Sequence, residues 1–268
     1  MSYADDEPRD ERGRWTAGGG GSGEVAKVSP GMPRGELMGA DPTKGISPEL
    51  LKLADSYRAR AGVTNTPLPR IDAVDPKAGA MMARAYELLK NDPTNPEVQA
   101  AYKTFVAETH AQMEALKAAG YTYTFVNQDP YHNSAEMLTD LRDNHHLDVL
   151  SSATTGGHPV MTNSENDEFR AVHDSLGHGV YANQFGPKGE ENAYRAHAAL
   201  YSPTARSVMA TETRGQNSWM NFGPKSGVPL PQRPFAEQKA ALWPKNLQGD
   251  YGDMYRVTRQ RSITKRGG

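Results

Sequence analysis

Two short segments hold the residues whose types and spacing could do chemistry. The first, residues 169–178, contains two histidines, His173 and His178. The second, residues 211–217, has a carboxylate, Glu212, near its start. Two neutral imidazoles and one carboxylate are a common ligand set for a divalent metal that keeps open coordination positions. If the two segments meet in space, the sequence predicts a metalloenzyme.

The spacing of the two histidines does not suit a straight α-helix. At roughly 100° per residue, His173 lies roughly 40° from Phe169 on the apolar face, whereas His178 lies roughly 140° further round. A shared metal therefore requires the helix to end or widen before His178. Gly177 is the residue that permits this, and single-turn widenings are frequent at functional sites. We expect a break at Gly177.

Glu212 is expected on the buried face of its helix. Ser202-Pro203 is a typical helix start, and on that helix Glu212 falls between Val208 and Met209 in angle. Because burying a carboxylate alone is very costly, it needs a cation or a metal ion, and both alternatives stay open. Four arginines of nearby segments could supply the cation: Arg170, Arg195, Arg206 and Arg214.

The helix expected between these segments adds further candidates. His197 and Tyr194 share one of its faces, and either could support the metal ligands from behind. Glu190 lies two helical turns from His197, about 10 Å along the axis, so one helix cannot bring both to the same ion. Asp174 and Glu191 are carboxylates close in sequence to these histidines, and each is a candidate general base.

The residues that follow Glu212 are suited to holding a substrate. Arg214 offers a fork-shaped cation and is also a candidate catalytic residue. Gln216 and Asn217 offer amides, and Trp219 offers an indole. Such a set could orient a polar or planar substrate. The alternative is a turn held by its own side-chain hydrogen bonds.

The segment His173-Asp174-Ser175-Leu176-Gly177-His178 resembles the His-Asp-x-x-Gly-His segment of the aromatic amino acid hydroxylases. Thr211-Glu212 is similar to that family's glutamate in position and in its preceding threonine, over a somewhat shorter spacing. The resemblance implies a mostly helical fold and a non-haem Fe(II) ion held by His173, His178 and Glu212. Positions would remain for O₂ and substrate. It does not extend to a recognisable pterin-binding segment.

Three other segments resemble phage proteins. Residues 8–15 with the following glycines are similar to a charged, Gly-rich segment of phage head-associated proteins. Residues 189–192 and 211–219 are similar to segments of a phage-associated family without an assigned activity. These resemblances imply a phage-encoded chain, phage head proteins as partners, and a place in the host cytoplasm or on the virion.

Composition narrows the classes of function. The chain has 268 residues, no cysteine and a formal net charge of -2. Disulfides, thiolate nucleophiles and zinc–thiolate sites are excluded, so any metal must be held by nitrogen and oxygen. The charge gives no bias toward nucleic acid, except weakly through the basic residues 256–266. Without an apolar run of about 20 residues, no membrane span is expected.

The predicted fold is mainly α with a small β element: a single helical domain with disordered termini. We expect a charged, Gly-rich tail over 1–45, a helical metal-binding domain over 46–245 and a basic flexible tail over 246–268. Hydrophobic periodicity and capping signals place the individual elements. Helices are expected from Pro48 and over 76–89, 96–119, 134–144, 166–177, 189–201 and 203–214, and strands over 121–126 and 147–150.

The leading hypothesis is a mononuclear Fe(II) site of His173, His178 and Glu212 in an oxygen-dependent oxygenase or hydroxylase, with residues 214–219 positioning the substrate. One alternative is a hydrolase with zinc or another divalent metal, in which Asp174 or Glu191 is the general base. Another is a non-enzymatic virion-associated or packaging protein. Whether the substrate is a small molecule, a nucleobase or a peptide stays open.

Overall fold

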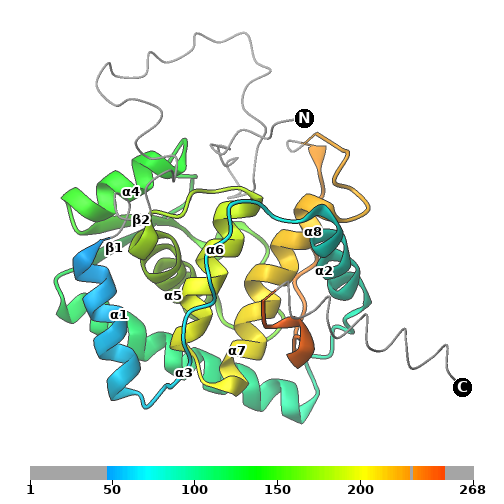
Figure 1. Cartoon of the computed structure of the whole chain (residues 1–268), viewed down its shortest axis with the longest axis horizontal. Coiled ribbons are helices and arrows are strands. Elements are labelled where there is room, and N and C mark those ends of the chain that lie inside the picture. Colours follow the sequence, from blue (N-terminus) through cyan, green and yellow to red (C-terminus); the bar gives the residue numbers. More distant parts are fainter. Residues whose placement is uncertain (1–46, 230–231, 251–268) are drawn as a thin grey trace, which may run out of the picture.

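The computed structural model describes residues 47–229 and 232–250 of the chain (Figure 1). The expectations for residues 1–45 and for the basic residues 256–266 lie outside these ranges. Within them the chain is mainly helical with one small two-stranded sheet, as the sequence predicted. No helix in these ranges is long and apolar enough to cross a membrane.

The elements follow the predicted order. The helices are α1 (Pro48–Arg60), α2 (Pro76–Leu88), α3 (Pro96–Ala118), α4 (Ser134–Asp143), α5 (Asn163–Val172), α6 (Pro187–His197), α7 (Pro203–Ala210) and α8 (Gln216–Phe222). The strands are β1 (Thr122–Val126) and β2 (His146–Leu150). Two π-helical turns, His173–His178 after α5 and Thr211–Gly215 between α7 and α8, interrupt the regular helices.

Helix starts are set by a capping side chain followed by proline. Ser47, Asp75, Asn95 and Ser202 precede the first residues of α1, α2, α3 and α7, and each side chain accepts a hydrogen bond from a backbone N–H of the first turn. Proline at the next position has its φ already close to the helical value and lacks an N–H that would go unpaired. Each cap stabilises its helix by about 1 kcal/mol.

The small sheet is a parallel pair joined through α4. Thr122 pairs with His146 and Val126 with Leu150, so β2 begins one residue before the predicted strand. A parallel pair needs a crossover connection, and α4 is that crossover. The sheet lies beside α1 and α4 at one edge of the molecule, away from α7 and α8 (Figure 1).

Two apolar clusters form the core, and α5 contributes to both. One cluster joins α2, α3, α7 and α8, with Met82 and Phe105 at its centre. The other joins α1, α4 and the sheet, with Leu141 and Leu147 fully or almost fully buried. Phe169 of α5 belongs to the first cluster and Val172 to the second. The π turn that continues α5 therefore lies where the two clusters meet.

The ordered body extends beyond the predicted boundary at residue 245. The Arg214 guanidinium donates to the carbonyls of Leu247 and Gly249, each at 2.9 Å. The Tyr194 hydroxyl donates to the carbonyl of Gln248, also at 2.9 Å. These hydrogen bonds hold residues 246–250 against α6 and the second π turn, so this stretch is not part of a flexible tail.

Candidate metal centre

The helix that carries the histidines widens at the point where the sequence required it. The π turn spans His173–His178, and a short 3₁₀ turn, Gly179–Tyr181, follows it. A π turn has more residues than an α turn, so a residue five positions on returns to nearly the same side. The two imidazole centroids are 5.2 Å apart, with their planes at 83°. Widening therefore brings both rings to one place.

Gly177 is required by close packing within this turn. A Cβ atom at this position would lie 2.9 Å from His173 Nδ1 and 3.2 Å from the Ala193 carbonyl oxygen. Any other residue would push against the first imidazole and against α6. The helix therefore widens around Gly177, as expected, but does not break there, and the glycine serves the packing of His173.

The carboxylate that meets the two histidines belongs to Glu190. Its residue lies in the first turn of α6, and α6 packs against the π turn. Glu190 Oε1 is 3.3 Å from His178 Nε2, and Glu190 Oε2 is 4.0 Å from His173 Nε2. All three residues are buried, and one ligand atom from each lies within 4.8 Å of the others.

Three atoms of this group lack a hydrogen-bond partner within the described part of the chain: His173 Nε2, His178 Nε2 and Glu190 Oε1. Leaving buried polar atoms unpaired costs about 1–3 kcal/mol each, so such atoms call for an explanation. Two ligands about 2.1 Å from one ion are about 3.0 Å apart at a right angle and about 3.4 Å at a tetrahedral angle. The 3.3 Å between Glu190 Oε1 and His178 Nε2 lies in this range, whereas the 4.0 Å between Glu190 Oε2 and His173 Nε2 would have to shorten for both residues to bind one ion.

Hydrogen bonds behind the imidazoles set their tautomers. His178 Nδ1–H donates to the Asn183 carbonyl at 2.8 Å, so Nε2 is the nitrogen that presents a lone pair once a cation displaces its proton. The Gln112 Oε1 carbonyl, 2.9 Å away, accepts from His197 Nε2–H. His197 Nδ1 then accepts from His173 Nδ1–H at 3.1 Å, so His173 Nε2 also carries a lone pair. Both lone pairs lie on the nitrogens nearest Glu190, as metal ligands require.

Burial and the Glu190 charge shift the pKa values of the group. Burial lowers the pKa of His173 and, helped by the neighbouring imidazoles, holds the pKa of His197 well below its usual range. Burial opposes charge on Glu190 and His178 too, but their mutual attraction outweighs it, lowering the pKa of Glu190 and raising that of His178. Glu190 is therefore ionised, and a bound cation would replace the proton on His178.

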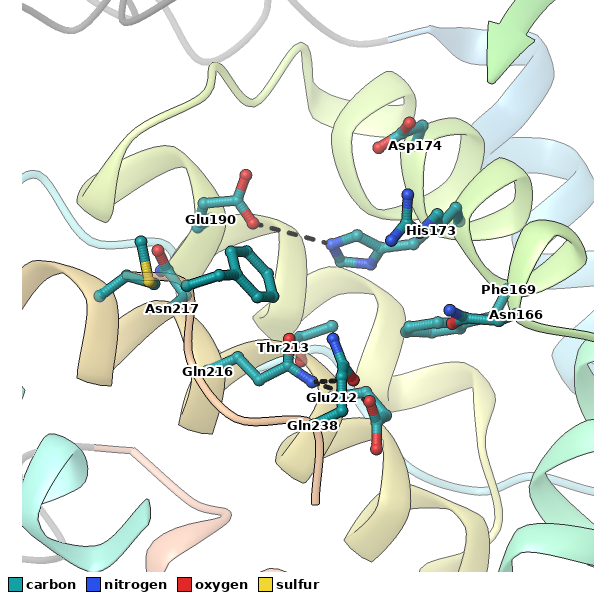
Figure 2. Close-up of a pocket in the computed structure, with 13 residues that line it drawn as sticks. Asn166, Phe169, His173, Asp174, Glu190, Glu212, Thr213, Gln216, Asn217 and Gln238 are labelled. Carbon is teal, nitrogen blue, oxygen red and sulfur yellow. Dashed lines mark hydrogen bonds and ion pairs between the residues drawn. The ribbon is translucent and has the colours of Figure 1, made fainter. Parts of the chain in front are cut away.

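The group lies at the wall of a cavity of about 130 Å³. His173 and Glu190 line it, whereas His178 is fully buried behind them. Figure 2 shows these two side chains on one side of the cavity and Glu212 with its neighbouring amides on the other. Phe235 also lines the cavity and is 37% exposed, so the cavity reaches the surface there.

Glu212, the carboxylate that the sequence analysis expected as a metal ligand, lies on the opposite side of the cavity from His173 and Glu190. Its carboxylate accepts from the Tyr102 hydroxyl, from His158 Nε2 at 3.1 Å and from Gln216 Nε2 at 2.8 Å. It belongs to the second π turn and is absent from the group of possible ligands found among the described residues. Glu190 takes the position expected for Glu212 because α6, rather than α7, packs against the π turn His173–His178.

Glu191 and Arg214 form an interior ion pair. Glu191 accepts from Arg195 Nε at 2.7 Å, from Arg214 Nε at 3.0 Å and from Arg214 Nη2. The Arg214 guanidinium lies 4.1 Å above the Tyr194 ring. None of these four residues lines the cavity. Glu191 was expected as a general base, Arg214 as a substrate-binding and catalytic residue, and Tyr194 as a supporting residue. The structure brings none of these three to the site.

The other expected residues divide between the cavity and the core. Asp174, Gln216 and Asn217 line the cavity. Trp219 packs against the first apolar cluster instead and is not among the lining residues. His197 lies behind His173, where sequence reasoning placed a supporting residue.

Sequence reasoning missed Glu190 as a ligand and Gln112 as a supporting residue. Glu190 lies two helical turns from His197, and as expected the two residues do not meet at one ion. Glu190 faces the ligand nitrogens, and His197 lies behind one of them. No local signal marks Gln112, because it comes from α3, far away in sequence.

Comparison of the chain with protein-family models, with curated proteins and with solved structures gave no match. The resemblances to aromatic amino acid hydroxylases and to phage proteins therefore stay predictions.

Proposed function

We propose that this chain is a metal-dependent enzyme that binds one Fe(II) ion through His173, His178 and Glu190 and oxidises a small substrate in the adjoining cavity with O₂. The observation that carries the proposal is the convergence of three buried ligand atoms without hydrogen-bond partners in the described ranges. Two histidines and one carboxylate leave coordination positions open, and when bound by them Fe(II) supplies the activation of O₂.

The residues of the chain have distinct tasks in this proposal. His178 and Glu190 supply a buried imidazole and a full negative charge to the site. Gln112 and His197 keep the proton of His173 on Nδ1, so that its Nε2 can bind. The cavity beside His173 and Glu190 leaves room for a small substrate.

A zinc-dependent hydrolase is the second candidate, and one observation favours it. A hydrolase needs a general base near the metal-bound water. Glu191 is held by two arginines away from the cavity, whereas Asp174 lines the cavity next to His173. Iron remains the first choice because the His-Asp-x-x-Gly-His segment resembles an iron-binding segment.

Metal analysis with two matched variants tests the proposal. The full-length protein is purified without oxygen, loaded with Fe(II) or Zn(II), and assayed for bound metal. We expect one ion per chain in the wild type and in Glu212→Gln, and strong loss of metal in Glu190→Gln. Both substitutions neutralise a buried carboxylate at the same cavity, so the comparison isolates the ligand role.

The outcomes separate the candidate functions. Oxygen consumption that depends on Fe(II) and on Glu190 supports the oxygenase. Preference for Zn(II), with hydrolysis that is lost in Asp174→Asn, supports the hydrolase. A wild-type protein that binds neither ion after reconstitution overturns both and leaves the non-enzymatic alternative of a virion-associated or packaging protein.

A further inference from the structure

We infer that Glu212 and the amides around it form a recognition site for a cationic nitrogen, so that the ligand of the cavity is a small amine or guanidine in its protonated form. The inference deepens the proposed function, on which it rests, by naming the substrate class of the same cavity. It starts from the charge of Glu212, which is 8% exposed and faces the cavity.

The imidazole that touches Glu212 is neutral. His158 Nδ1 accepts backbone N–H groups from Val160 at 3.1 Å and Met161 at 3.0 Å. A nitrogen that accepts two hydrogen bonds carries a lone pair and no proton. The single ring proton is therefore on Nε2, which donates to Glu212 Oε1 at 3.1 Å.

The remaining partners of Glu212 are neutral as well. The Tyr102 hydroxyl and the Gln216 amide donate to its two oxygens. No lysine or arginine of the described residues forms an ion pair with it. Three neutral donors solvate the carboxylate but do not compensate its charge, and a buried charge without a counter-ion is costly. A cation entering the cavity would supply the missing charge.

The surroundings of Glu212 favour an N–H donor of limited size. The Gln216 amide nitrogen is shared between Glu212 Oε2 at 2.8 Å and Gln238 Oε1 at 3.1 Å, so two acceptor oxygens lie side by side. Phe169 and Phe235 add aromatic walls, which also attract cations. A cavity of about 130 Å³ is close in volume to one of about 150 Å³ that holds benzene.

Three probes of similar size and different charge test the inference: benzylammonium, benzyl alcohol and benzoate. Binding is measured by isothermal titration calorimetry on the full chain, with and without metal. We expect benzylammonium to bind at least about tenfold more tightly than benzyl alcohol, since charge-assisted hydrogen bonds are roughly twice as strong as neutral ones. Benzoate should bind most weakly to the metal-free protein, because its charge repels that of Glu212.

Two variants remove the recognition charge in different ways. Glu212→Gln should abolish the preference for benzylammonium while the ion stays bound at His173, His178 and Glu190. Gln238→Lys places an ammonium group beside Glu212 and should abolish the preference without altering the buried carboxylate itself. Gln238→Met, which removes the acceptor oxygen but adds no charge, is its matched control and should lower the preference less than Gln238→Lys does. If Glu212→Gln fails to fold, Gln238→Lys still decides.

The inference is overturned if the wild type binds benzylammonium and benzyl alcohol equally, or if the preference survives in Gln238→Lys. Failure of the proposed function has another signature. In that case the amine preference is present in metal-free protein, but no ion binds to the wild type. Metal binding without amine preference overturns only the inference about the substrate class.

Discussion

The two π turns of this chain are alike in backbone and opposite in chemistry. His173–His178 and Thr211–Gly215 each follow a regular helix, each is buried, and each presents ionisable groups to one cavity. In the first turn the facing nitrogens of both histidines lack hydrogen-bond partners in the described ranges. In the second, the Glu212 carboxylate has three donors.

Their glycines show the same contrast. Gly177 makes room for the His173 ring, whereas Gly215 makes room for the rings of Tyr86 and Trp243, which a Cβ atom would meet at 2.6 and 2.8 Å. One glycine therefore packs a candidate ligand and the other packs the apolar core. Widening a helix gives access to a cavity, but the hydrogen bonds behind each side chain decide whether it can bind an ion.

The largest effect expected from this contrast is stabilisation by metal. An ion at about a thousandfold excess over its Kd adds about 4 kcal/mol to the free energy of unfolding. For a chain of this size we therefore expect Tm to rise by roughly 8–16 °C. Differential scanning calorimetry should show this rise with Fe(II) under argon for the wild type and Glu212→Gln, and no rise for Glu190→Gln.

Addition of a chelator is the control and should reverse the rise. If both carboxylate variants respond to metal equally, the ion binds outside the first turn. The contrast between the two turns would then have no functional meaning.

A smaller effect on stability is expected when a methyl group is added at Gly177 or at Gly215. Gly177→Ala and Gly215→Ala both force atoms into occupied space, and each should lower the free energy of unfolding by about 1–3 kcal/mol. Urea unfolding of the metal-free proteins measures this. Only Gly177→Ala should also weaken metal binding, because the atom it displaces belongs to His173.

Gly215→Ala is thus the matched control for general destabilisation. Weaker metal binding in Gly215→Ala, to the same degree as in Gly177→Ala, would show that the two turns are coupled through the core.

Much of the fold could be predicted because its signals are local. A capping side chain followed by proline marks the starts of α1, α2, α3 and α7. The need for a widened helix also followed from sequence, since the angle between His173 and His178 on a straight helix excludes a shared ion. Gly177 could be named from the sequence, although the structure requires it for close packing against His173 rather than for an unusual backbone conformation.

The choice of carboxylate could not be predicted, because it depends on how helices pack. Glu190 and Glu191 are neighbours, but adjacent residues on a helix point about 100° apart. As α6 crosses the histidine turn, Glu190 therefore faces the imidazoles while Glu191 faces two arginines. Arg214 was expected to bind substrate, but its guanidinium pairs with Glu191 and donates to the carbonyls of Leu247 and Gly249.

The smallest effect tests whether hydrogen bonds behind the first turn make it a metal site. Gln112→Met removes the carbonyl that accepts from His197, so His173 Nδ1 is no longer the favoured place for its proton. Loss of such an outer partner typically lowers metal affinity about 10–100-fold, and we expect the lower end because His173 itself remains. Competition with a chelator measures the affinity, and Gln112→Glu, which keeps an acceptor, should restore it.

Nitrogen-15 NMR of the metal-free protein reports the tautomer of each histidine directly. It therefore distinguishes control of the His173 tautomer from a purely structural role of Gln112. In Gln112→Met the proton of His173 should shift from Nδ1 toward Nε2, while that of His178, which donates to the Asn183 carbonyl, stays on Nδ1. If neither the affinity nor the His173 signal changes, the chain does not set this tautomer. The hydrogen bonds behind His173 would then not be what distinguishes the first turn from the second.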